Sequence, residues 1–202
     1  MPLVFDEIVT GFRFAYGGAQ EFYKVVPDLA AFGKVVAGGF PLACIAGPAR
    51  IMRHFDAALE GTPEYVWQAG TFNGNAIAAA AGLATLAELR KPGTYERLFK
   101  TGTRLKAGLQ AAVTKHGVAA QVSGEPPVFD LFFTDRPVVD YRATLTADRA
   151  KIARFNQELL RRGAVKAVNK IYVSLAHSDA DVDETLGIFD EVLACLSPDA
   201  RS

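Results

Sequence analysis

Two stretches in the first part of the chain place ionisable side chains beside apolar runs. Leu3-Val4-Phe5 leads directly into Asp6 and Glu7, and Lys34 lies between the apolar stretches LAAFG and VVAGGF. A lysine amine buried among apolar side chains has a lowered pKa, and its neutral form attacks a carbonyl carbon to form a Schiff base. Each residue also has an ordinary alternative, because a carboxylate at a strand end commonly caps a turn and most lysines are solvated.

The other residue types with reactive potential show no recognisable spacing. The turn AGGF is not GxGxxG and lacks the Lys-Ser/Thr pair of a Walker loop, which disfavours nucleotide binding. The three histidines lack HxxxH or HExxH spacing, so we expect no metal site. Cys44 and Cys195 lie far apart in the sequence without metal-binding spacing, which is typical of reduced thiols in a cytosolic protein.

The composition is that of a globular protein without a charged partner. Of the 202 residues, 50% are hydrophobic, and 22 Lys and Arg balance 22 Asp and Glu. This balance indicates neither a nucleic-acid surface nor a polybasic membrane patch. No uninterrupted apolar stretch approaches the ~18–20 residues that a bilayer span needs. We therefore expect a cytoplasmic protein with no nucleic-acid or membrane partner.

Hydrophobic periodicity and punctuation by Gly and Pro predict alternating strands and helices. Leu3–Phe5 is a predicted strand, and GKVVAGGFPLACIAG (33–47) is interpreted as two strands joined by a tight turn. Further elements are expected at 76–90 (helix), 94–115 (helix), 128–135 (strand), 149–162 (helix), 171–177 (strand) and after Ser178 (helix). A domain boundary near Pro92 would separate an α/β part, residues 1–92, from a compact α+β domain, residues 93–202.

Several longer motifs, in order, resemble a known family. VFDEIVTGFR, GGAQEFYKVVPDLAAFGKVVAGGFPLACIAG, QAGTFNGN, AAGLATL, LFFTDRPVVDY and VSLAHSDADVDETL are similar to class III pyridoxal 5′-phosphate (PLP) aminotransferases of fold type I. Within that family they most resemble the glutamate-1-semialdehyde 2,1-aminomutases. The resemblance implies an α/β fold. The first part of the chain would be the C-terminal part of a fold type I large domain, with the later strands of its all-parallel sheet, and the second part would be the small α+β C-terminal domain.

The resemblance also implies roles for four residues. Lys34 aligns with the lysine that forms a Schiff base with PLP and later moves the α-proton. Asp6 aligns with the carboxylate that keeps the pyridine nitrogen protonated. Ile8 lies two residues further on, on the same face as Asp6, where it could pack beneath the ring. Thr71 aligns with a threonine that binds the cofactor phosphate of the neighbouring subunit, which implies a homodimer.

Other notable residues are given structural interpretations. Glu7, on the opposite face from Asp6, is expected in an ion pair or turn, and Arg13 in a structural role, with a substrate-carboxylate role left open. His177 is expected to stabilise the turn between the last strand and helix. The phenylalanines of the 128–135 strand are expected in the core or sheet: Phe129, Phe132 and Phe133.

Three departures from the family pattern leave the reaction open. Family members are about twice as long, so we expect a fragment or truncated product. Gly74-Asn75-Ala76 stands where Gly-Asn-Pro is usual, and Asn169 stands where the aminomutases carry an acidic residue. The alternatives are amino transfer within one substrate, as in an aminomutase, or a transaminase that uses another amino donor and a keto acid or aldehyde acceptor. A third is an inactive dimerisation or interaction fragment.

Overall fold

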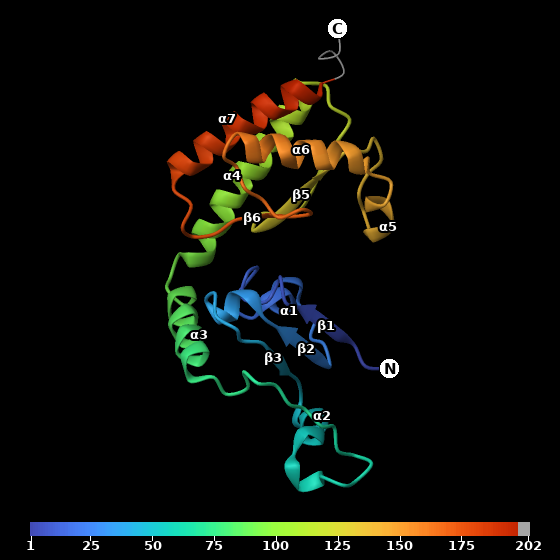
Figure 1. Cartoon of the computed structure of the whole chain (residues 1–202), viewed down its shortest axis with the longest axis vertical. Coiled ribbons are helices and arrows are strands. Elements are labelled where there is room, and N and C mark those ends of the chain that lie inside the picture. The colour runs from blue at the N-terminus through green and yellow to red at the C-terminus, as the bar shows by residue number, and fades with distance from the viewer. Residues whose placement is uncertain (198–202) are drawn as a thin grey trace. The chain divides into compact units, whose positions relative to one another are not determined.

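The computed structural model describes residues 1–197, and the chain divides into two compact units. Unit 1 is Met1–Tyr95 and unit 2 is Glu96–Ser202. Each unit contains its own three-stranded sheet (Figure 1). None of the helices in the described part of the chain is long and apolar enough to span a bilayer.

The sheet of unit 1 has mixed strand directions. Its strands are β1 (Val4–Glu7), β2 (Leu29–Phe32) and β3 (Cys44–Ala46), in the order β1-β2-β3. β1 and β2 are parallel, whereas β3 is antiparallel to β2. The expectation that this sheet is all-parallel is therefore wrong for the described residues. The reason is the short connection from β2 to β3, which carries no crossover helix long enough to return the chain in the same direction.

The segment after β2 also differs from the prediction. Lys34–Ala37 forms a 3₁₀ helix, η1, so only the second apolar stretch, in β3, is a strand. Val36 and Ala37 are buried, and Gly38 ends the turn in the left-handed region at φ 57°, where its N–H donates to the Val35 carbonyl. A short apolar run cannot be assigned to helix or strand from periodicity alone, and the turn forced by Gly38 decides the outcome.

The longest helix of unit 1 packs closely against η1. This helix, α3 (Ala76–Leu89), starts at Asn75, whose Oδ1 accepts a hydrogen bond from the Ala78 N–H at 2.9 Å. Gly82 makes the close approach possible, because a methyl group there would lie 3.0 Å from the Val36 carbonyl oxygen. The shorter helices are α1 (Gly18–Tyr23), α2 (Ala49–Met52), η2 (Arg53–Phe55) and η3 (Ala57–Leu59).

Unit 2 is an α+β domain whose sheet is antiparallel in the order β4-β5-β6. The apolar faces predicted for the three long helices are largely buried, including Leu109, Phe155 and Val182. The Phe133 and Phe155 rings meet edge to face, and Phe155 stacks on Phe189. The elements are α4 (Thr94–Lys115), β4 (Gln121–Glu125), β5 (Val128–Phe132), α5 (Tyr141–Thr144), α6 (Arg149–Arg161), β6 (Ile171–Tyr172) and α7 (Asp179–Leu196).

The last strand, β6, is shorter than the predicted strand over 171–177. The Val173 N–H still donates to the Pro127 carbonyl, but from Ser174 the backbone is held by side chains: the Ser174 N–H donates to His177 Nδ1, and the Ala176 N–H donates to Ser174 Oγ. Such local hydrogen bonds replace the ladder and end the strand. Ser178 then begins α7 with a capping box shared with Asp181.

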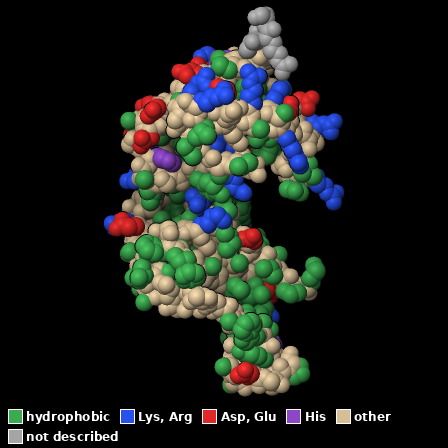
Figure 2. Space-filling view, in the orientation of Figure 1, with side chains coloured by type: hydrophobic (Ala, Val, Ile, Leu, Met, Phe, Trp, Pro, Cys, Tyr) green, Lys and Arg blue, Asp and Glu red, His purple; other side chains and the backbone are tan. Residues whose placement is uncertain are grey.

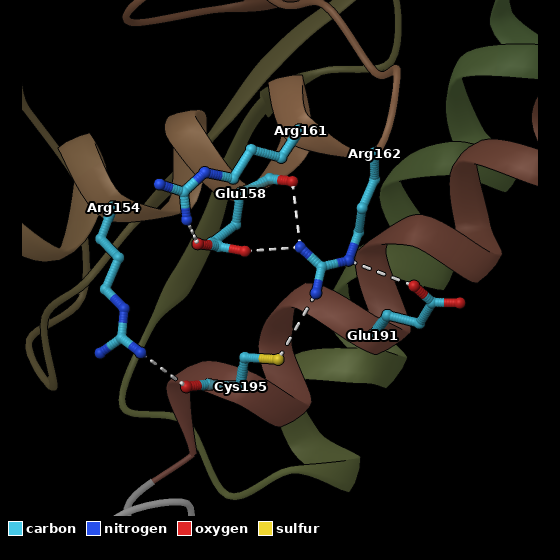
Figure 3. Close-up of polar contacts among 6 residues, drawn as sticks. All are labelled: Arg154, Glu158, Arg161, Arg162, Glu191 and Cys195. Atoms are coloured by element: carbon cyan, nitrogen blue, oxygen red, sulfur yellow. Dashed lines mark hydrogen bonds and ion pairs between the residues drawn. The ribbon is translucent and has the colours of Figure 1, made fainter.

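An ionic cluster links α6 to α7 (Figure 3). The Glu158 carboxylate accepts hydrogen bonds from Arg162 at 2.6 Å and from Arg161 at 2.8 Å. Arg162 also donates through Nε to Glu191 at 3.2 Å, and its Nη2 lies 3.6 Å from the Cys195 sulfur. The hydrogen bond from Arg162, with the positive charges of Arg161 and Arg162, lowers the pKa of the Glu158 carboxyl.

Replacing Glu158 by Gln should therefore reduce stability in a pH-dependent way. Because the pKa of Glu158 is lowered in the folded state, its contribution is present above the unfolded pKa of about 4.3 and is lost as the pH falls through the folded value. Urea unfolding followed by circular dichroism should show a deficit for Glu158→Gln near pH ~7 that disappears near pH ~3. Glu184→Gln, at an exposed position on α7, is the control. A deficit that persists unchanged at acidic pH would contradict the assignment.

Candidate active site

Asp6 and Lys34 are brought to the same edge of the unit 1 sheet by parallel pairing. Asp6 lies opposite Ala31, and Glu7 lies opposite Phe32, in the register of β1 and β2. Lys34 follows the end of β2 by two residues. Since the carboxyl ends of parallel neighbours lie at one edge, the carboxylate and the amine both belong to the edge at which open α/β sheets bind ligands.

Lys34 has an unusual backbone and an accessible side chain. It is the first residue of η1 and has φ 47°, in the left-handed region that costs energy for a residue other than glycine. The expected burial of Lys34 is not found: the residue is exposed. In the described part of the chain, its amine has no hydrogen-bond or ion-pair partner. The amine is therefore available to a bound molecule.

Asp6 is also exposed and only partly engaged. Its Oδ1 accepts a hydrogen bond from the Ile8 N–H at 3.0 Å. Among the described residues, its Oδ2 has no partner. This leaves one carboxylate oxygen free to accept a bond from a cationic N–H group, while the other is fixed by the backbone.

Ile8 and Thr71 line one cavity of about 840 Å³ in unit 1. Ile8 approaches the start of η1, because a methyl group at Gly33 would lie 3.1 Å from Ile8 Cδ1. The lining is mainly apolar, with polar groups from the 68–74 loop that contains Thr71. Asp6 and Lys34 are not among the lining residues. The structure thus brings the four predicted residues to two places: a sheet edge and an adjacent cavity that meet at Ile8.

The residue types present fit PLP. A free primary amine suits the cofactor aldehyde, and a carboxylate with an open oxygen suits a protonated ring nitrogen. A hydroxyl on the wall of an apolar cavity suits a phosphate oxygen. In contrast, no three His, Cys, Asp or Glu side chains of residues 1–197 form a group that could hold a metal ion.

Glu7 is completely buried and accepts more hydrogen bonds than a residue that only caps a turn. Its Oε2 accepts hydrogen bonds from the Ala19 N–H at 2.6 Å and from Thr10 Oγ1 at 2.8 Å. Its Oε1 accepts from the backbone and side-chain nitrogens of Gln20 at 3.1 and 3.3 Å. Glu7 thus ties the end of β1 to the start of α1. The expected turn role is confirmed, and the partners are N–H and hydroxyl donors.

The other side chains that were given structural interpretations lie in structural positions. Arg13 donates through Nε to the Val9 carbonyl at 2.9 Å. His177 accepts from the Ser174 N–H at 3.3 Å, as expected for a residue that stabilises the turn. Phe129 and Phe133 are buried in the core of unit 2, and Phe132 is half-buried at the end of β5.

Comparisons with known proteins find aminotransferases and aminomutases. Residues 1–193 match the family described as aminotransferase class-III. The chain is 42% identical over 197 residues to a glutamate-1-semialdehyde 2,1-aminomutase of Desulfosudis oleivorans, covering 96% of this chain and 45% of that protein. An omega-transaminase from Sphaerobacter thermophilus has a similar structure, with a TM-score of 0.86 and 33% identity over 96% of this chain and 44% of that one.

A third match is the PLP internal aldimine form of the FumI protein from Sphingopyxis sp. MTA144, with a TM-score of 0.79 and 29% identity. It covers 99% of this chain and 44% of that one. The chain thus spans less than half the length of these relatives. The structural matches confirm the expected fold class, an α/β part of a fold type I transferase.

Replacing Glu7 by Gln should destabilise unit 1. The amide nitrogen of Gln would face backbone N–H donors, so buried donors would lose their acceptor at a cost of about 1–3 kcal/mol. Hydrogen exchange of the β1 and α1 amides should accelerate in Glu7→Gln. The same change at Glu88, whose side chain is 66% exposed, should leave these rates unchanged. Equal exchange in wild type and Glu7→Gln would mean that Glu7 does not hold this end of β1.

Proposed function

This chain belongs to the class III aminotransferases, and from that premise we propose that its residues serve PLP-dependent amino-group transfer. The family uses PLP as its cofactor. The proposal rests on the pairing of β1 with β2. This pairing brings the Lys34 amine, which has no partner among the described residues, and the Asp6 carboxylate, which has one free oxygen, to the same sheet edge. The proposal concerns the four residues Lys34, Asp6, Ile8 and Thr71.

Each residue has a distinct task in this proposal. PLP, when bound, supplies an aldehyde and a ring that accepts electrons from the substrate carbon. The Lys34 amine would hold the aldehyde carbon of the bound cofactor, and the free amine would remove and return the α-proton of the substrate. The free oxygen of Asp6 holds a proton on the ring nitrogen. Ile8 packs against the ring, and the Thr71 hydroxyl donates to the phosphate of the partner subunit's cofactor.

Two versions of the reaction have separate support. The 42% identity to a protein named glutamate-1-semialdehyde 2,1-aminomutase favours amino transfer within one substrate. Ala76 departs from the usual family loop, and Asn169 stands where the aminomutases carry an acidic residue. The similarity to an omega-transaminase favours a separate amino donor and a keto acid or aldehyde acceptor. We propose aminomutase-type chemistry first and the transaminase as the second candidate.

Trapping the cofactor on lysine tests the proposed site. The full chain is incubated with PLP and treated with borohydride, which makes the link between the aldehyde and a lysine amine permanent. Peptide mass spectrometry should find saturable labelling at Lys34 that is lost in Lys34→Ala. Lys24→Ala is a matched control, because Lys24 is also exposed and has φ 58°. Labelling spread evenly over lysines, and unchanged in Lys34→Ala, would overturn the assignment of Lys34.

An exposed apolar face on α3 supports the proposed homodimer. Figure 2 shows hydrophobic side chains gathered over this helix. Two of the large apolar residues of α3, Ile77 and Leu83, are 67% and 71% exposed. A helix that is apolar on all sides is normally covered on all sides. A second copy of the chain would cover this face next to the 68–74 loop, which carries Thr71.

Charges on this face should weaken the dimer. Sedimentation velocity of the wild type should show a dimer, and Ile77→Glu with Leu83→Glu should shift it to monomer because two buried carboxylates would lack partners. Leu160→Glu, at a 61% exposed position on α6, should sediment as wild type. A monomeric wild type, or an unaffected double variant, would exclude this face as the dimer contact.

A further inference from the structure

Unit 2 contains a buried ion pair that the proposed reaction does not use. Lys166, in the loop after α6, lies 3.1 Å through Nζ from Oδ1 of Asp130 in the middle of β5. The two side chains are only 7% and 8% exposed. Charged side chains are rarely buried to this extent unless they are paired, so each of these residues depends on the other.

The same lysine also organises the loop to which it belongs. Lys166 Nζ donates to the carbonyls of Ala167 at 2.9 Å and Val168 at 3.2 Å. Asn156 of α6 donates through Nδ2 to the same Val168 carbonyl at 3.0 Å. Loop 163–170 is therefore attached to β5 through a charge pair and to α6 through an amide.

Hydrophobic burial does not explain the position of this loop. Its two valines, Val165 and Val168, are 83% and 72% exposed. The residues from Gly163 to Lys166 nevertheless form one wall of a cavity of about 260 Å³, opposite α7 residues such as Val182 and Phe189. A wall whose apolar side chains point to solvent needs polar contacts to stay in place.

The energetics of Asp130 argue against a purely stabilising role. Burial raises the pKa of the Asp130 carboxyl, and the opposing effects of Lys166, the Leu131 N–H and Lys170 do not cancel it. A folded-state pKa above the unfolded value means that ionisation of Asp130 disfavours folding, so stability falls as the pH rises through that range. Buried pairs of this kind can often be replaced by apolar side chains without loss of stability.

We propose that Asp130 and Lys166 form a buried latch whose role is to fix loop 163–170 against β5, and with it one wall of the unit 2 cavity, rather than to stabilise the unit. Both are positioning residues. The latch explains why a carboxylate interrupts the otherwise apolar VFDLFF strand segment. The proposal is independent of PLP chemistry.

Trypsin tests the latch in the full chain, because it cleaves after accessible lysines. In wild type, the Lys166 side chain is buried and Lys170 in the same loop is exposed, so cleavage after Lys170 is an internal reference. Asp130→Asn keeps the shape but removes the countercharge, so Lys166 should leave the interior. Cleavage after Lys166 should then rise on the order of tenfold or more relative to Lys170. Asp190→Asn, which breaks the exposed Lys115–Asp190 pair, should not change this ratio.

A double variant separates positioning from stability. Asp130→Leu with Lys166→Met should unfold at the same or a higher urea concentration than wild type, while the 163–170 amides exchange faster. If Asp130→Asn fails to fold, the double variant alone tests the proposal. Wild-type exchange of the loop in the double variant would overturn the latch, as would an unchanged trypsin ratio in a folded Asp130→Asn. A large loss of stability in the double variant would instead assign the pair a stabilising role and overturn the proposal.

Discussion

The parallel register of β1 and β2 places Asp6 opposite Ala31 and Glu7 opposite Phe32. Successive side chains of a strand point to opposite faces, so a slip of one residue would exchange Asp6 and Glu7. Asp6 would then face α1, and Glu7 would turn away from α1. The four hydrogen bonds of Glu7 oppose such a slip, because it would break all four of them. The position of Asp6 therefore depends on its buried neighbour.

Elements whose signals are local could be predicted from the sequence. The helix over 94–115 was predicted at the bounds that the structure has, and the helix after Ser178 was predicted from an N-cap serine and an apolar stripe. The placement of Asp6 at a strand end was also accessible, because an apolar run precedes it, whereas Lys34 was expected within the strands over 33–47 and instead follows β2 in η1. Their ligand roles came from the resemblance to a family and stay predictions.

Elements decided by distant partners could not be predicted in the same way. Lys34–Ala37 carries the apolar composition of a strand, but Gly38 and the packing of α3 make it a 3₁₀ turn. The direction of β3 depends on its pairing with β2, which periodicity does not encode. Likewise, the pairing of Asp130 with Lys166 joins a strand to a loop beyond the next long helix. No local sequence pattern identifies one residue as the partner of the other.

Burial differs between the charged groups that have partners within the chain and those that keep a free atom. Glu7 and Asp130 are buried, and their partners, backbone N–H groups and a lysine amine respectively, belong to the chain itself. Asp6 and Lys34 are exposed, and each keeps an atom without a partner among the described residues. A group that must bind an external molecule cannot be satisfied internally, since each internal hydrogen bond would have to be broken first. In unit 1, the buried and fully bonded Glu7 next to the exposed and partly bonded Asp6 is an arrangement that leaves a carboxylate oxygen available at this sheet edge.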